Sequence, residues 1–344
     1  MSQDQESNST HDRILACLYG QAIGDAFGMP SELWPKSRVQ QHFGWIDSFL
    51  PGPAENIAAN EFSRGQFTDD TSQCVALMDS VIASQGQIVP TVLGEHLMAW
   101  AERIHAFDKN ILGPTSKSAL LALQNGTPLE QIEANGITNG SAMRVAPVGC
   151  LVATCDKDQF IEAVRLSCLP THKSDIAIAG AVVIAWSVSR AVEGANWQQI
   201  KEEIAPLAND VQRLHESTFS PLLGKRIQYA LSVVSEQEDT RAGLNDIYEM
   251  VGAGMDIIES IPAAVALVEL SGTNPSLCAE LAANLGGDTD TIGAMATAIC
   301  GALQGLSAFD PDYISLINQA NNIDFAPYAE ALTSFRLSEN KTHR

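Results

Sequence analysis

Gly286-Gly287-Asp288-Thr289-Asp290-Thr291-Ile292-Gly293 leads directly into an Ala-rich apolar stretch that continues to about residue 306. Because small and apolar residues occupy most faces of that stretch, it is expected to form an interior helix of a helical bundle. A second cluster, Thr68-Asp69-Asp70-Thr71, stands more than 200 residues earlier and also precedes an apolar helical pattern. The two clusters are expected to meet at one end of the bundle.

The rest of the chain carries the same helical period. Apolar residues recur at three- and four-residue spacing from Asp12 to Phe27, where Gly28-Met29-Pro30 ends the pattern. Alternating strand-like runs with hairpin turns are nearly absent. We therefore expect an all-α fold with one compact multi-helix domain. Further helices are predicted at about 71–84, 91–106, 115–125, 140–153, 158–169, 174–193, 197–208, 220–235, 243–251, 255–270, 276–285, 290–306 and 326–336.

The predicted domain covers residues 12–336, with a flexible N-terminus at 1–11 and a flexible C-terminus at 337–344. Within it, residues 33–66 lack a sustained period and carry several aromatic side chains, among them Trp34, Trp45 and Phe49. A long irregular segment inside a compact domain is usually functional.

Composition excludes several classes of partner. The formal charge of −21 repels nucleic acid and anionic membranes, so neither is an expected partner. The seven cysteines include no Cys-x-x-Cys pair, which indicates buried free thiols in a reducing compartment. The longest apolar run, about 176–188, is too short to span a bilayer, and the N-terminus has no signal-peptide core. A soluble cytoplasmic protein is expected; nothing indicates its oligomeric state.

The two acidic clusters predict a metal site. A single Thr or Asp before a helix is commonly an N-cap, but capping needs one side chain rather than four in a row. Adjacent carboxylates next to an apolar core repel each other unless a cation neutralises them. Carboxylates and hydroxyls are hard oxygen donors, which suit a pair of Mg²⁺ or Mn²⁺ ions.

Other segments add candidate residues. Glycines at 20, 24 and 28 form a stripe of small residues along one helix, which suggests tight helix packing. Asp25 lies beside that stripe, and the sequence is equally consistent with a structural hydrogen bond and with a role in the chemistry. Beside a metal pair, Glu32 is a candidate general acid or base. The turns at 138–144 and 113–116 resemble anion-binding helix starts, with weaker support for the second. Scattered histidines disfavour zinc, and no Gly-x-Ser-x-Gly elbow is present.

These motifs together resemble the ADP-ribosylglycohydrolase family, of the dinitrogenase-reductase-activating type, in order along about residues 12–306. The matching segments are Gly24-Asp25-Ala26-x-Gly28 with Glu32, Thr68-Asp69-Asp70-Thr71, Asn139-Gly140-x-x-Met143-Arg144, Thr171-His172 and Gly287-Asp288-Thr289-Asp290-Thr291-Ile292-Gly293. The resemblance implies an all-α fold with two Mg²⁺ or Mn²⁺ ions at the base of an ADP-ribose cleft. The segment 33–66 is longer than the loop common in the family.

The resemblance also assigns roles to residues. The implied metal ligands are Thr68, Asp69, Asp70, Asp288, Asp290 and Thr291. Glu32, Asp69 and Asp290 are the implied catalytic residues. Near the substrate, the implied residues are Asn139, Gly140, Ser141, Met143 and His172.

The leading functional hypothesis is metal-dependent hydrolysis of a glycosidic bond at ribose C1, which releases ADP-ribose from an ADP-ribosylated substrate. One alternative keeps the site but changes the substrate to a free nucleoside or a small ADP-ribosyl compound. Another is a non-catalytic ADP-ribose-binding protein that retains the fold.

Overall fold

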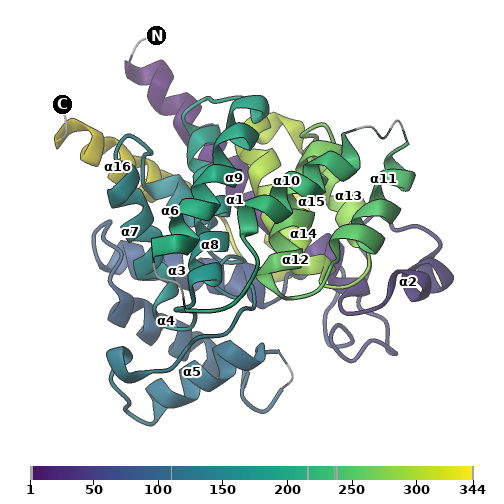
Figure 1. Cartoon of the computed structure of the whole chain (residues 1–344), viewed down its shortest axis with the longest axis horizontal. Helices are drawn as coiled ribbons and strands as arrows, with labels where there is room; N and C mark the ends of the chain where they lie inside the picture. Colours follow the sequence, from purple (N-terminus) through teal and green to yellow (C-terminus); the bar gives the residue numbers. More distant parts are fainter. Residues whose placement is uncertain (1–2, 110, 215–216, 236, 238, 343–344) are drawn as a thin grey trace.

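The computed structural model describes residues 3–109, 111–214, 217–235, 237 and 239–342. These residues contain no β-strand, and the all-α prediction is confirmed (Figure 1). The α-helices are α1 Gln3–Gly28, α2 Lys36–Phe43, α3 Asp69–Ala83, α4 Pro90–Arg103, α5 Pro114–Gln124, α6 Ala146–Leu151, α7 Lys157–Cys168, α8 Asp175–Val192, α9 Trp197–Leu214, α10 Leu223–Val234, α11 Thr240–Asp246, α12 Ile257–Leu270, α13 Pro275–Ala283, α14 Thr289–Gln304, α15 Pro311–Asn321 and α16 Ala326–Thr342.

Helices α1 and α14 pack backbone to backbone at the centre of the fold. A methyl group added to Gly20, Gly24 or Gly28 of α1 would overlap with backbone carbonyl groups of α14. The reverse holds for Gly293 of α14, where an added methyl would approach the carbonyl oxygen of Gly24. The tight packing predicted from the glycine stripe is therefore present. It fixes the start of α14 against the end of α1.

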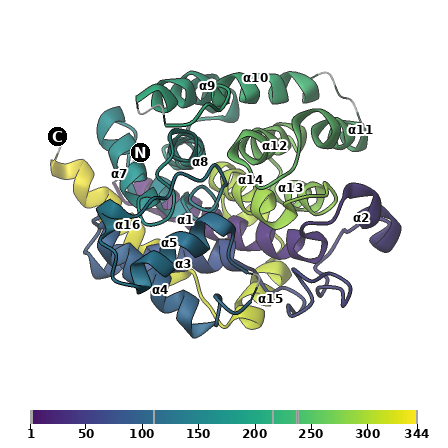
Figure 2. The same cartoon turned by 60° about the horizontal axis from the view of Figure 1, so that its bottom comes forward.

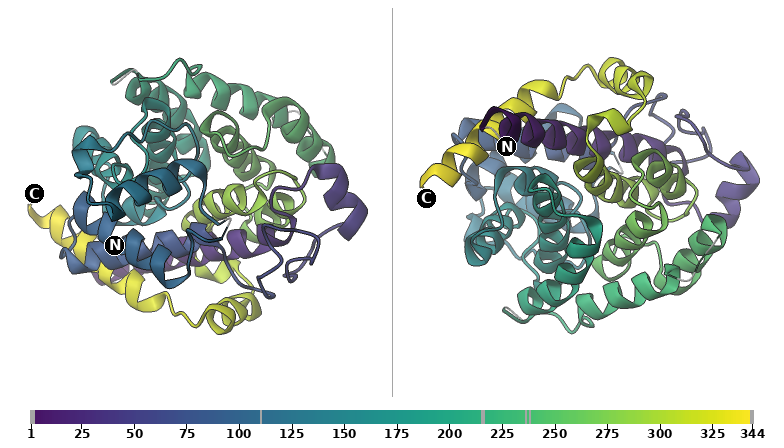
Figure 3. Two further views of the ribbon diagram at one scale, coloured as in Figure 1. Left: turned by 90° about the horizontal axis from the view of Figure 1, so that it is seen from below. Right: turned by 90° about the horizontal axis from the view of Figure 1, so that it is seen from above.

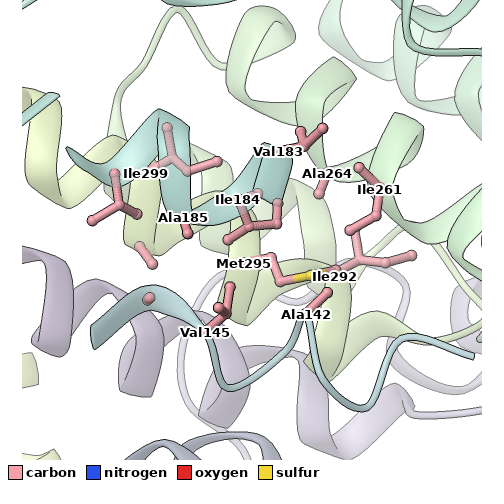
Figure 4. Close-up of a cluster of buried hydrophobic side chains, with 14 of the residues drawn as sticks. Ala142, Val145, Val183, Ile184, Ala185, Ile261, Ala264, Ile292, Met295 and Ile299 are labelled. Atoms are coloured by element: carbon pink, nitrogen blue, oxygen red, sulfur yellow. The ribbon is translucent and has the colours of Figure 1, made fainter. Parts of the chain in front are cut away.

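A layer of apolar side chains surrounds this pair. Figure 4 shows Val183, Ile184 and Ala185 of α8 above Met295 of α14, with Ile261 of α12 beside them. The side chains in this cluster are fully buried. Helix α8 is long and apolar enough to cross a membrane by length and composition, but 89% of it is buried inside the fold, the position of a core helix.

The outer helices cover the core on opposite sides. Helices α9, α10 and α11 form one outer layer, next to α8 and α12 (Figure 2). Both ends of the described chain lie on the side away from α2 and the loop that follows it (Figures 1 and 3).

Six of the seven cysteines are buried free thiols as predicted, whereas Cys155 is exposed.

Several predicted boundaries differ from the structure. Helix α1 begins at Gln3 rather than Asp12, and α16 continues to Thr342 rather than ending near 336. Helices α2 and α15 were not predicted. Flexibility of residues 1–11 and 337–344 stays a prediction, and residues 1–2 and 343–344 of those segments lie outside the described part of the chain.

The helix predicted from residue 140 is wrong, because residues 140–144 form a turn and α6 begins only at Ala146. Pro147 has no N–H and cannot donate to the carbonyl of Met143, as a continuing helix would require. The side-chain amide of Gln21 donates to that carbonyl instead, at 2.8 Å. The turn leaves its residues free to face the start of α14.

Candidate metal centre and cavity

The starts of α3 and α14 meet at one cavity, as expected from the sequence. Its lining includes most of the predicted site residues, namely Glu32, Asp69, Asp70, Asn139, Gly140, Met143, Asp288, Asp290 and Thr291. The cavity is also lined by residues outside the predicted set, namely Ile111, Gly113, Pro114, Ser116, Thr138 and Met255. The turn signal at 113–116 pointed to part of that second group, whereas Ile111 and Met255 stand in segments without a comparable signal.

Asp25 of α1 holds the first acidic cluster in place. Its Oδ1 accepts hydrogen bonds from the backbone N–H and the hydroxyl of Thr68, both at 2.9 Å. Its Oδ2 accepts from the N–H of Thr71 at 3.0 Å and from the Thr71 hydroxyl at 2.6 Å. The sequence left the role of Asp25 open between structure and chemistry. Four accepted hydrogen bonds show that the structural role is present.

Three buried carboxylates from three helices approach one another at the base of the site. Ligand oxygens of Asp25, Asp70 and Asp290 all lie within 4.8 Å of one another. The hydroxyl of Thr68 lies among them, 2.9 Å from Asp70 Oδ2 and 3.3 Å from Asp290 Oδ2. Oδ1 of Asp70 and Oδ1 of Asp290 are buried without a hydrogen-bond partner. Buried polar atoms without partners are rare in proteins, so these two oxygens fit a bound cation.

Burial and mutual repulsion disfavour the ionised form of these carboxylates, and a bound cation would offset both effects. Burial, and next the charge of Asp70, raise the pKa of Asp25 to about 8 and that of Asp288 to about 7. Burial raises the pKa of Asp70 to about 6. The pKa values of Glu32, Asp69 and Asp290 lie well above their usual range for the same two reasons, burial first. An all-oxygen donor set with unfavourable negative charge is what Mg²⁺ or Mn²⁺ requires.

Backbone contacts hold the second acidic cluster. Leu33 N–H donates to the Gly287 carbonyl at 2.7 Å, and Gly287 N–H donates to the Trp34 carbonyl at 2.8 Å, which places Glu32 beside the cluster. Asp288 N–H donates to the Ala253 carbonyl at 2.7 Å. Its side chain accepts from Asn139 Nδ2 at 2.7 Å. Asn139 thus joins the 139–144 turn directly to the carboxylate cluster.

Buried polar side chains support the 139–144 turn from behind. Arg144 is fully buried and donates to Gln73 Oε1, the Gly140 carbonyl, the Ser167 carbonyl and Thr171 Oγ1. The 138–144 turn was expected to resemble an anion-binding helix start, but the guanidinium of Arg144 within it is used to hold the turn. The cavity lining given above includes Gly140 but not Ser141, whose side chain is buried.

His172 is fully buried beneath the same turn. Its Nε2 lies 3.1 Å from the Thr138 hydroxyl, and its Nδ1 lies 2.9 Å from the Thr171 hydroxyl. Burial, and then the charge of Arg144, lower the pKa of His172 to about 3, so the ring is neutral. A methyl group added to Gly140 would approach the ring at 2.7 Å. In this geometry His172 supports the turn, and the described cavity lining does not include it.

The aromatic residues of the 33–66 segment pack into the fold. Trp34 and Phe49 are buried, and the Phe49 ring contacts Phe27 of α1 at a centroid distance of 4.5 Å. Trp45 donates from its indole N–H to Glu280 of α13. None of these three side chains is among the described residues that line the cavity. The segment therefore contributes the contacts to Gly287 that hold the preceding residue, Glu32, in place, while its aromatic rings stabilise its own position.

Fold and site together define the class of protein. The sequence profile of the ADP-ribosylglycohydrolase family matches residues 6–340, and the chain belongs to that family. The chain accordingly folds as a single all-α domain of the ADP-ribosylglycohydrolase type.

Particular relatives differ widely in distance. The chain is 54% identical to the uncharacterized protein YegU of Escherichia coli over 94% of this chain and 97% of that protein. It is 23% identical to the ADP-ribosyl-[dinitrogen reductase] glycohydrolase of Rhodospirillum rubrum, with 94% and 96% covered. It is 25% identical to the mouse ADP-ribosylhydrolase ARH3, with 86% and 84% covered. A solved ADP-ribosylglycohydrolase-related protein complex matches the fold with a TM-score of 0.69 at 24% identity, covering 96% of this chain and 99% of that one.

Proposed function

We propose that this protein is a metal-dependent hydrolase that cleaves the glycosidic bond at ribose C1 of ADP-ribosylated substrates and releases ADP-ribose. Family membership supports a hydrolase of this general type. The observation that carries the metal requirement is the pair of buried carboxylate oxygens without partners, Asp70 Oδ1 and Asp290 Oδ1, at the base of the cavity. Two Mg²⁺ or Mn²⁺ ions are the proposed cofactors.

The proposed ligands come from both clusters, namely Thr68, Asp69, Asp70, Asp288, Asp290 and Thr291. Bound divalent ions would act as Lewis acids and offset the negative charge of the cavity. Asn139 orients Asp288 through its hydrogen bond, so the second cluster presents its oxygens in a fixed direction. The proposed catalytic residues are Glu32, Asp69 and Asp290. Among them we assign the role of general acid or base to Glu32, which lines the cavity beside Asp288 and Asp290.

The shape of the cavity limits how a substrate can lie. Its volume is about 60 Å³, which suits ions and a few water molecules. The ribose is therefore expected at the mouth, and the rest of the ligand over the exposed lining residues Pro114 and Met255. Ser141 and His172 are proposed to act through the position of the 139–144 turn.

A second candidate is an N-glycosidase that acts on a free nucleoside or a small ADP-ribosyl compound. The described lining of the cavity contains five carboxylates and no Lys, Arg or His. A diphosphate would thus find no side-chain cation within the cavity, which favours a substrate with less negative charge.

The free cysteines support a reducing compartment, and we propose a cytoplasmic location on that basis.

Turnover separates the two candidates. Purified protein is incubated with ADP-ribosyl-arginine peptide, ADP-ribosyl-serine peptide and plain nucleosides, with Mg²⁺, with Mn²⁺ and with excess chelator, and free ADP-ribose or free base is quantified. The proposal expects ADP-ribose release that chelation abolishes and metal restores. Turnover of nucleosides alone selects the second candidate. Tight ADP-ribose binding without turnover of any substrate would select a binding protein and end the enzymatic proposal.

A further inference from the structure

The short Gly-rich loop at residues 252–256 connects the two parts of the candidate site. Ala253 accepts a hydrogen bond through its carbonyl from Asp288 N–H at 2.7 Å. Two residues later, the Met255 carbonyl accepts from Asn139 N–H at 3.0 Å. Because Asn139 and Asp288 are themselves joined by a side-chain hydrogen bond, the loop and these two residues close a ring of contacts. The position of this loop therefore sets the position of both residues.

Further contacts fix the same loop on both sides. Ile257 N–H donates to the Ile137 carbonyl at 2.9 Å, and Thr138 forms an isolated antiparallel bridge with Asp256. A methyl group added to Gly287 would overlap with the Ala253 carbonyl. Met255 lies at the cavity and is 38% exposed, so one face of the loop reaches the site itself.

The loop has little intrinsic order of its own. It contains Gly252 and Gly254 within three residues, and Gly252 has a φ of +96°, a conformation that glycine adopts readily. Glycine-rich backbone loses more conformational entropy on ordering than other backbone. Something outside the loop must therefore hold it in the position that Asp288 and Asn139 require.

Besides the contacts given above, Glu259 supplies one that reaches the centre of the loop. Its Oε2 accepts a hydrogen bond from Gly254 N–H at 2.8 Å. Its carboxyl group also lies where a side chain on Gly252 would have to go, 2.6 Å from an added methyl group. Glu259 occupies the third helical position of α12, where a glutamate often binds the N-cap N–H. Here its carboxylate reaches two residues further back, to the centre of the loop.

We propose that Glu259 is a positioning residue for the metal centre, acting through the 252–256 loop on Asp288 and Asn139. The proposal rests on the proposed function, because it assumes that Asp288 is a metal ligand. It assigns a role to a residue that touches neither the cavity nor the carboxylate cluster. Groups that orient metal ligands from outside typically affect metal affinity by about ten- to a hundredfold.

Hydrogen exchange of the metal-free protein tests the structural half of the proposal. Four proteins are compared: the unaltered chain, Glu259→Ala, Glu259→Gln, whose amide oxygen can still accept from Gly254, and Glu95→Ala, an exposed glutamate on α4, as the matched control. The amides of Asn139 and Asp288 are expected to exchange at least about tenfold faster in Glu259→Ala. Exchange in Glu259→Gln and Glu95→Ala is expected to match the unaltered chain. Equal exchange in all four proteins overturns the proposal.

Mn²⁺ affinity, measured by calorimetry on the same four proteins, tests the functional half. Glu259→Ala is expected to bind Mn²⁺ about tenfold more weakly, with affinity retained in Glu259→Gln. A Glu259→Ala protein with a lower melting temperature but unchanged Mn²⁺ affinity would show an ordinary helix cap, and would overturn the proposal. If the unaltered chain binds no Mn²⁺, the proposed function fails, and the exchange rates alone decide whether Glu259 positions Asn139 and Asp288.

Discussion

Residues 68–71, Thr-Asp-Asp-Thr, and residues 288–291, Asp-Thr-Asp-Thr, each combine two threonines with two aspartates, but the fold holds them by different means. The first cluster is held mainly by side-chain hydrogen bonds to the buried carboxylate of Asp25. The second is held by backbone contacts, with α14 packed against the glycines of α1 and with Asp288 bound to the 252–256 loop. The comparison teaches that one cluster depends on hydrogen bonds to a buried carboxyl group and the other on close packing.

The largest expected effect comes from removing Asp290, a carboxylate of the second cluster that lies next to Thr68 of the first. Asp290→Ala is expected to lower kcat/KM for the preferred substrate by roughly a thousandfold or more, because the pocket loses a charged group at the reacting centre. ADP-ribose release measures this, with Glu95→Ala as the control for loss of an exposed carboxylate. Activity within tenfold of the unaltered chain would remove Asp290 from the reaction.

Gly24→Ala tests the packing that holds the second cluster. The added methyl group would overlap with the Gly293 carbonyl, so the two helices must separate. A loss of about 3 kcal/mol in the free energy of unfolding is expected, as for other overpacked cores. Urea unfolding measures the loss. Gly94→Ala, inside α4, is the control, since its methyl group meets only a side chain at 3.4 Å; that variant is expected to be neutral or more stable.

Asp25→Asn tests the hydrogen bonds that hold the first cluster. An amide has a single acceptor oxygen, so two of the four hydrogen bonds to Thr68 and Thr71 are lost. Mn²⁺ affinity is expected to fall about ten- to a hundredfold, as for other residues that orient metal ligands. Asp79→Asn, on the helix α3 that the first cluster begins, is the control, because an amide oxygen can still accept from Tyr328. Equal affinities for Asp25→Asn and the unaltered chain would contradict the distinction between the clusters.

The smallest effect concerns the turn between the clusters. Because the pKa of His172 is lowered to about 3, the folded protein keeps the ring neutral while the unfolded chain takes up a proton near pH 6.5. The stability from this residue is present above pH 6.5 and is lost as the pH falls toward 3. Between pH 6.5 and 5.5 the unaltered chain is expected to lose about 1 kcal/mol more than His172→Gln. Parallel stability curves for the two proteins would show that His172 is protonated in the fold.

Much of the fold could be predicted from sequence because its helices are apolar over long stretches. Helices α8, α12 and α14 are almost wholly buried, so their patterns are strong. Helix α15 was missed because Ile317 is its only fully buried residue among those described. The turn at 140–144 was misassigned because Ala142, Met143 and Arg144 suit a helix locally. Pro147 was the available signal against that assignment.

The site was predicted as far as its motifs reach. The carboxylates at 69–70 and 288–290 stand in recognisable clusters, and the cavity brings them together. The roles of Asp25 and Met255 depend on contacts with segments far away in the chain, which no local pattern reveals. Glu259 binds the nearby Gly254, but the link from that loop to Asn139 and Asp288 is long-range. His172 and Arg144 have residue types that suggest ligand contact, but burial directs both toward the 139–144 turn.

Calorimetric titration with Mn²⁺ tests the central claim most directly, that residues from both clusters share one metal centre. The unaltered chain is expected to bind two ions, and single substitutions in either cluster, Asp70→Ala or Asp290→Ala, are each expected to weaken or abolish that binding. A flat titration of the unaltered chain, or binding that depends on one cluster and ignores the other, would contradict the account.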